Sequence, residues 1–261
     1  MVFIQKNSRA KYSYNNKEYN VFINEYGGRG DVVKNLKEKT VIACFGGSTT
    51  INGSNDSLTY PFQMAKQLDS SYAVFNFGVA GLNSSSYVKK YNEISKNLKI
   101  DYVLEYNCVN SIRWKIFPTY YEKLAKLEKL LLKSYFINYV FGNFFLPSEK
   151  EIEKDVHEQI IMELKNFNQI LKKDNVKLII STFLYPKIKN ASFFEKNYLD
   201  IHIRQYWESK FISYKSYTKI VEIYNNMLLK SFSFDNNVKV LDINKSSLIL
   251  NAFILIPSSF K

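Results

Sequence analysis

One serine in the sequence stands where a reactive hydroxyl could be presented. Ser48 follows an apolar run and two glycines in the stretch VIACFGGSTT, residues 41–50. A serine hydroxyl attacks an acyl carbon when a neighbouring base takes its proton and nearby donors stabilise the developing oxyanion. The same letters also describe an ordinary turn, because glycine and serine are common where a strand ends. The flanking elements must decide between these two interpretations.

Five short apolar runs predict β-strands, and helical patterns separate them. The runs cover residues 40–45, 72–78, 101–106, 176–186 and 238–243. Amphipathic stretches, such as residues 118–136 and 148–174, predict helices between the runs. Strands joined by helical crossovers form a parallel sheet that is covered on both faces. We therefore expect a three-layer α/β/α fold with a central, mostly parallel five-stranded sheet.

Small polar residues follow three successive strands of this predicted sheet. The segments are GGST after the first strand, NFGVAGLNSS after the second and YNCVNSI after the third. Ligands bind at the carboxyl ends of the strands in such sheets. Glycine lets backbone N–H groups approach a ligand closely, and Ser and Asn add hydroxyl and amide groups. A turn explains any one of these loops, but three in succession favour a site for developing negative charge.

These three segments, in this order, resemble the first three sequence blocks of the SGNH hydrolases, the GDSL-type esterases and lipases. The stretch INEYGGRGD, residues 23–31, also resembles the N-x-x-G-x-R-G segment that precedes the serine block in one bacterial branch. The resemblance covers about residues 22–113 and implies a flavodoxin-like fold. It implies hydrolysis of acyl or acetyl esters, on a carbohydrate or lipid, with no metal and no organic cofactor. Cys108 and Ser111 stand where the family more often has Gly and Asp.

Carried over position by position, the resemblance gives roles to three residues. Ser48 is the nucleophile that forms an acyl-enzyme, and its own backbone N–H is one oxyanion donor. Gly81 supplies a second backbone N–H, and Asn110 adds a side-chain amide. A tetrahedral acyl intermediate needs several such donors, and the loss of one typically lowers the rate about 10²–10³-fold.

The catalytic base is the part of the site that the sequence does not supply. The resemblance places it in a D-x-x-H motif after the last strand, but residues 243–261 contain neither Asp nor His. His157 lies in a charged amphipathic helix. His202 follows Asp200 as D-x-H and precedes the last strand, so it is a weak candidate for the base.

Three explanations for the missing base stay open. The chain is truncated or frameshifted after about residue 250, or it is a degenerate relative that still binds a ligand, or another group such as His202 substitutes. We favour the first explanation, because the tail ILIPSSFK departs abruptly from the expected pattern.

The net charge of +12 raises the alternative of a nucleic-acid binder. Only four of the 36 basic residues are Arg, the residue best suited to bidentate contacts with phosphates and bases, and the lysines are spread along the chain. The charge therefore favours a solvated surface, and we expect no nucleic-acid partner. Cys44 and Cys108 lie in apolar contexts and indicate neither a disulfide framework nor a metal site.

Length and hydropathy predict one globular domain with a short extension. We expect residues 36–261 to form the SGNH hydrolase-like domain without its C-terminal block, and residues 1–35 to pack on it as an extension. The sequence shows no apolar run long enough to span a membrane and no signal peptide, which predicts a cytoplasmic chain unless an upstream anchor was lost. The expected partner is a small-molecule or glycan ester. The alternative is a catalytically degenerate SGNH-fold protein that binds a carbohydrate or an acyl group.

Overall fold

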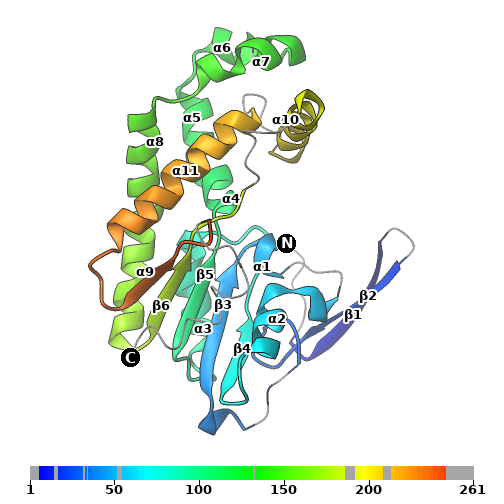
Figure 1. The fold of residues 1–261 in the computed structure, drawn as a ribbon, viewed down its shortest axis with the longest axis vertical. Helices are drawn as coiled ribbons and strands as arrows, with labels where there is room; N and C mark the ends of the chain where they lie inside the picture. The colour runs from blue at the N-terminus through cyan, green and yellow to red at the C-terminus, as the bar shows by residue number, and fades with distance from the viewer. Residues whose placement is uncertain are drawn as a thin grey trace.

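The main sheet of the computed structural model has five parallel strands in the order β4-β3-β5-β6-β7 (Figure 1). The strands are β3 (Thr40–Gly46), β4 (Tyr72–Asn76), β5 (Tyr102–Tyr106), β6 (Lys177–Ser181) and β7 (Val238–Leu241). The structure describes residues 6–14, 17–31, 33, 35–51, 55–131, 133–185, 192–207 and 213–244. Each strand falls on one of the five predicted runs, so the predicted parallel sheet is confirmed.

Helices connect the strands. In chain order they are η1 (Leu36–Glu38), α1 (Ser48–Ile51), η2 (Asp56–Leu58), α2 (Tyr60–Gln67), η3 (Ser84–Ser86), α3 (Tyr87–Ile94), α4 (Val109–Ser111), η4 (Ile112–Ile116), α5 (Phe117–Lys123), α6 (Lys126–Leu131), α7 (Tyr135–Phe141), η5 (Gly142–Phe145), α8 (Glu149–Val156), η6 (His157–Ile161), α9 (Met162–Lys173), α10 (Phe193–Trp207) and α11 (Tyr214–Ser231). Within the ranges that the structure describes, none of these helices is long and apolar enough to cross a membrane.

The prediction of a single helix over residues 118–136 is wrong. The chain forms α5, then α6 and the start of α7, with Leu124 in an extended conformation between the first two. Leu124 packs against the main core, whereas α6 and α7 continue away from the sheet to one end of the molecule (Figure 1). The second long pattern, residues 148–174, is confirmed as the continuous run of α8, the π-helical turn η6 and α9.

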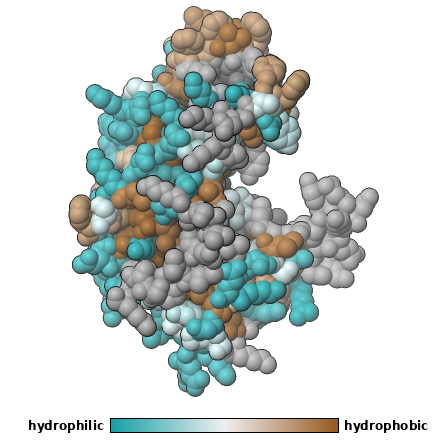
Figure 2. Space-filling model, in the orientation of Figure 1, coloured by the Kyte–Doolittle hydropathy of each residue, from teal (hydrophilic) through white to brown (hydrophobic). Residues whose placement is uncertain are grey.

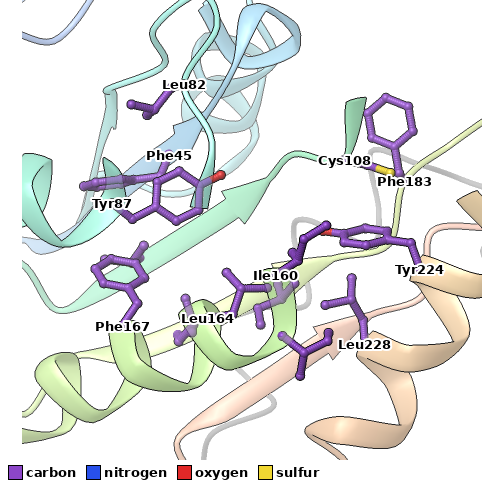
Figure 3. Packing of buried hydrophobic residues seen from close by; sticks show 14 of the residues in the cluster. Phe45, Leu82, Tyr87, Cys108, Ile160, Leu164, Phe167, Phe183, Tyr224 and Leu228 are labelled. Atoms are coloured by element: carbon purple, nitrogen blue, oxygen red, sulfur yellow. The ribbon is translucent and has the colours of Figure 1, made fainter. Parts of the chain in front are cut away.

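Helices cover both faces of the sheet, which gives the three layers of the predicted fold. Phe45 on β3 packs against Tyr87 of α3 and Phe167 of α9, and its ring centroid is 5.9 Å from that of each (Figure 3). On the opposite face, Cys44 packs in a second cluster with Met64 of α2. Neighbouring residues of a strand point to opposite faces, so the side chains of Cys44 and Phe45 pack against helices on opposite sides of the sheet.

The strand order places a topological switch point between β3 and β5. The chain runs from β3 to β4 on one side, and then from β5 outward to β7 on the other. Gly46 and Tyr106 are paired at the carboxyl ends of β3 and β5. In open α/β sheets, ligands bind in the crevice at such a point. Beyond this point β3 is followed by α1, which begins at Ser48, and β5 is followed by α4, which contains Asn110.

An antiparallel hairpin, which the sequence patterns did not predict, precedes the main sheet. It consists of β1 (Ser8–Tyr14) and β2 (Lys17–Ile23), and the loop after β2 reaches the main sheet through Arg29. The backbone N–H of Arg29 donates to the carbonyl of Asn76 at 2.7 Å, and its guanidinium pairs with Asp56 at 2.5 Å. The guanidinium also donates to the carbonyl of Ile51, the last residue of α1. The loop after β2 therefore helps to hold the short helix that begins at Ser48.

Replacing Arg29 with Ala should lower the free energy of unfolding by about 2–4 kcal/mol, because two charge-assisted contacts of a buried guanidinium are lost. Urea denaturation would measure the loss. Lys99→Ala is a matched control, because Lys99 pairs with Asp101 at 3.9 Å and its side chain is 91% exposed. Exposed pairs contribute little, so the control should change stability far less. Equal losses in the two variants would contradict an anchoring role for Arg29.

Candidate functional site

Ser48 is the first residue of α1, directly beyond β3. Its side chain is partly exposed and makes no hydrogen bond within the described residues, whereas Gly47 before it and Thr50 two residues after it are buried. The hydroxyl of Thr50 donates to the carbonyl of Tyr106 at 3.3 Å, and the amide of Asn76 donates to the carbonyl of Thr50 at 2.9 Å. The ends of β4 and β5 therefore fix α1, while the Ser48 hydroxyl stays accessible.

A very close approach joins the segments that follow β3 and β5. A Cβ atom on Gly47 would lie 1.9 Å from Nδ2 of Asn110, so only glycine fits beside this amide. The same Nδ2 donates to the carbonyl of Leu82 at 3.0 Å. Gly47 directly precedes Ser48, and Leu82 directly follows Gly81. These two contacts therefore bring the segments that carry the three predicted site residues together.

Gly81 lies in a tight turn beyond β4. The N–H of Leu82 donates to the carbonyl of Val79 at 2.9 Å and closes the turn, and the N–H of Val79 donates to the carbonyl of Gly46 at 3.0 Å. The φ angle of Gly81 is +80°, which glycine adopts readily at the third position of such a turn. Gly81 is exposed, and its N–H donates no hydrogen bond in the part of the chain that the structure describes. This N–H is therefore available to a ligand.

A buried hydrogen-bond network supports the Leu82 carbonyl. Nδ2 of Asn107 donates to this carbonyl at 2.8 Å and to the hydroxyl of Tyr87 at 3.1 Å. The Tyr87 hydroxyl in turn donates to Oε1 of Glu105 at 2.8 Å. The hydroxyl of Tyr224, on α11, donates to the backbone carbonyl of Asn107 at 2.6 Å. The carbonyl that receives the Asn110 amide is thus tied to α3, β5 and α11.

Glu105 is the buried acidic end of this network. It is 2% exposed, and its Oε2 has no hydrogen-bond partner among the described residues. Burial raises the pKa of Glu105 to about 8, against the opposing effect of the hydrogen bond from Tyr87. The carboxyl group is therefore mostly protonated at neutral pH. Sequence reasoning missed this group, although an acidic residue inside the buried run DYVLEY is a signal that could have found it.

Neither histidine of the chain forms a hydrogen bond with Ser48. His202 is exposed on α10, and its Nε2 lies 2.7 Å from the hydroxyl of Tyr198, one turn earlier. The carboxylate of Asp200 accepts from the first backbone N–H of α11 at 2.5 Å, so it makes no D-x-H pair with His202. His157 begins η6 and is partly exposed. The geometry assigns no base to Ser48 among the described residues.

The segment in which the resemblance expects a D-x-x-H motif, residues 245–261, lies outside the described residues. The last described residue, Asn244, donates from its amide to the carbonyl of Phe183 at 3.0 Å, just beyond β6. Over the described ranges, no group of three or more His, Cys, Asp or Glu side chains is arranged to hold a metal ion.

Comparisons with known proteins give remote structural matches. No family model matches the chain, and no curated protein does. One of the similar solved structures is that of the acetyl xylan esterase AlAXEase. The two chains are 16% identical, the match covers 84% of this chain and 83% of that chain, and the TM-score is 0.43. Another is a GDSL-like lipase from Bacteroides thetaiotaomicron, with 12% identity over 81% and 72% of the two chains and a TM-score of 0.39.

A third is a catalytic mutant of an acetylxylan esterase from Geobacillus stearothermophilus, with 12% identity over 78% and 75% and a TM-score of 0.39. These identities and TM-scores are low, so the case for a function rests on the residues of this chain.

Replacing Gly47 with Ala should displace the Asn110 amide, because the new methyl group would occupy its position. We expect the free energy of unfolding to fall by about 1–3 kcal/mol. The side-chain amide resonances of Asn110 should shift in a ¹⁵N NMR spectrum. Gly81→Ala is the comparison: its methyl group would meet nothing within 4 Å, but the positive φ costs about 1–2 kcal/mol. Unmoved Asn110 resonances in Gly47→Ala would contradict the close approach.

Glu105→Gln should change how stability depends on pH. Between the ordinary pKa of a glutamate, about 4.3, and the folded-state value of about 8, the folded wild type holds a proton that the unfolded chain has lost. Its stability therefore falls as pH rises, by at most about 1.4 kcal/mol per pH unit, and the slope disappears above pH 8. The variant keeps an acceptor for Tyr87 but lacks this titration. Urea denaturation should show the variant gaining on wild type from about pH 5 to 8, and a constant difference would contradict a buried, protonated Glu105.

Proposed function

We propose that the chain is a serine-dependent ester hydrolase of the SGNH type, with Ser48 as its nucleophile. The observation that carries the proposal is the contact of the Asn110 amide with both Gly47 and Leu82. This contact supports the proposal because it joins the segments that carry the Ser48 hydroxyl, the Gly81 backbone N–H and the Asn110 amide. These are the nucleophile and the oxyanion donors of acyl transfer through a serine, and the base that the reaction also needs is not found among the described residues.

In the proposed reaction, Oγ of Ser48 attacks the carbonyl carbon of the ester and forms a tetrahedral intermediate. The negative charge on the former carbonyl oxygen is stabilised by the N–H groups of Ser48 and Gly81 and by the amide of Asn110. The intermediate expels the alcohol, which leaves with the proton that the Ser48 hydroxyl gave up on attack, and the acyl group stays on Oγ. Water then attacks the acyl-enzyme, releases the carboxylic acid and restores the serine hydroxyl. No metal or organic cofactor takes part in these steps.

The proposed substrate is an acyl or acetyl ester of a small molecule, a glycan or a lipid. Ser48 is partly exposed and Gly81 is exposed, so the reactive groups do not lie at the bottom of an enclosed cavity. An open site suits an ester group that projects from a larger carrier, because only the acyl group has to reach the donors.

A second candidate function is binding of a carbohydrate or acyl group without turnover. It is favoured by the position of the two histidines, since neither bonds to Ser48. A serine hydrolase that lacks one member of its triad keeps only about 10³–10⁴-fold over the uncatalysed rate, from its oxyanion donors and binding. The two candidates therefore differ in whether Ser48 reacts at all.

Labelling with a fluorophosphonate probe tests the nucleophile directly. We expect slow labelling of the wild type and none of Ser48→Ala, because the probe captures an activated serine hydroxyl. Thr49→Ala is the matched control, since Thr49 is the exposed neighbour of Ser48 and should be dispensable. His202→Gln should label at the wild-type rate, because His202 is engaged with Tyr198. Equal labelling of wild type and Ser48→Ala would overturn the assignment.

Hydrolysis of p-nitrophenyl acetate separates the two candidate functions. A hydrolase releases p-nitrophenol faster than the Ser48→Ala protein does at the same concentration. A binding protein gives the same background rate for both proteins, while calorimetry still detects a ligand. Loss of the wild-type rate in an Asn110→Ala protein that keeps its fold would support the proposed oxyanion donor, with an expected decrease of about 10²–10³-fold.

A further inference from the structure

The helices between β5 and α8 expose an unusual amount of apolar surface. Leu124 and Phe145 pack against the main core and mark the two ends of the segment. Between them, residues 125–144 include α6, α7 and most of η5, and none of their described side chains is buried. This stretch reads AKLEKLLLKSYFINYVFGNF, so it is rich in large apolar residues. A folded segment of this composition normally packs such side chains against other apolar surface.

The exposed apolar side chains form a patch at one end of the molecule. The apical patch, as we call it, consists of Leu127, Leu130, Phe136, Val140, Phe141 and Phe144. Phe136 is 70% exposed and Phe144 is 82% exposed. Figure 2 shows hydrophobic surface gathered at the top of the view, where Figure 1 places α6 and α7. Isolated exposed hydrophobic residues are common, but a contiguous group on a projecting segment indicates a docking surface.

Basic residues lie in the same segment as this patch and indicate the charge of its partner. Residues 125–144 contain three lysines and one glutamate, and Lys126 and Lys133 are both exposed. Two copies of the chain that met through the patch would bring lysines of the same charge together. An anionic lipid surface offers the opposite charge to the lysines and an apolar layer to Phe and Leu. Short helices that combine Lys with Phe and Leu lie in a membrane interface without crossing it.

We propose that the apical patch seats on an anionic lipid bilayer, with its phenylalanines and leucines in the interface and its lysines against the headgroups. The helices α6 and α7 have six and seven residues, so they lie on the surface and do not span it. This inference goes beyond the proposed ester hydrolysis and does not depend on it, because it uses no residue of the candidate site.

Vesicle flotation tests the proposal. The purified chain is mixed with vesicles of phosphatidylcholine alone, or with vesicles of equal parts phosphatidylcholine and phosphatidylglycerol. We expect the chain to float with the anionic vesicles and much less with the neutral ones. The double variant Phe136→Ser and Phe144→Ser should bind at least about 10-fold more weakly, because two apolar anchors are lost. The double variant Lys126→Glu and Lys133→Glu should lose most of the preference for anionic vesicles.

Phe234→Ser supplies the matched control, because Phe234 is 96% exposed and lies in the turn between α11 and β7. It should float as the wild type does, and thermal unfolding should show that all variants are folded. The absence of wild-type flotation with anionic vesicles, or equal flotation of the phenylalanine variant, would overturn the proposal. A wild type that elutes as a dimer, together with a phenylalanine variant that elutes as a monomer and no flotation, would assign the patch to a second copy instead.

Discussion

The close approach of Gly47 to the amide of Asn110 is the contact on which the candidate site depends. Strands β3 and β5 are hydrogen-bonded neighbours, so the segments that follow them leave the sheet side by side at the switch point. A side chain at position 47 would fill the space that the amide occupies. Without one, Asn110 reaches the carbonyl of Leu82 and connects the loop after β4 to the other two. The absence of one Cβ atom thus allows three loops to meet.

The groups beneath this contact are polar and costly to bury, and they hold one another in place. Glu105 avoids most of the cost of a buried charge by remaining protonated, as its raised pKa requires. Tyr87 donates a hydrogen bond to Glu105, and Asn107 donates to both the Tyr87 hydroxyl and the Leu82 carbonyl. Buried networks favour one arrangement of the chain over its alternatives where their members are paired, as Tyr87, Asn107 and Oε1 of Glu105 are here, whereas Oε2 of Glu105 has no partner among the described residues. Burying the Glu105 carboxyl group costs stability, but the same network holds the Leu82 carbonyl in place as the acceptor of the Asn110 amide.

Sequence patterns predicted the strands and the loops, but not the contacts among them. The five runs had the length and the flanking turns of buried strands, and the parallel sheet rule brings their carboxyl ends to one edge. That rule indicated the three segments, and the resemblance to the SGNH hydrolases then named Ser48, Gly81 and Asn110 within them. The bond between Tyr87 and Glu105 joins α3 to β5 across 18 residues of chain, and no periodicity marks such a pair. The hairpin β1–β2 was not predicted, because its strands SRAKYSY and KEYNVFI mix polar and apolar residues and lack the continuous apolar run of a buried strand.

The wrong prediction over residues 118–136 has another physical cause, and it connects the two proposals. A helical period shows which side chains share a face, but it does not show that a core exists for that face to meet. Past Leu124 the chain leaves the core, so the apolar face of α6 stays exposed. In Figure 1, α1 and α4 lie at the carboxyl ends of the strands, which is the end of the sheet nearer to α6 and α7. Under the two proposals together, a bilayer bound at the apical patch would therefore lie beyond the end of the sheet that carries α1, the helix that begins at Ser48.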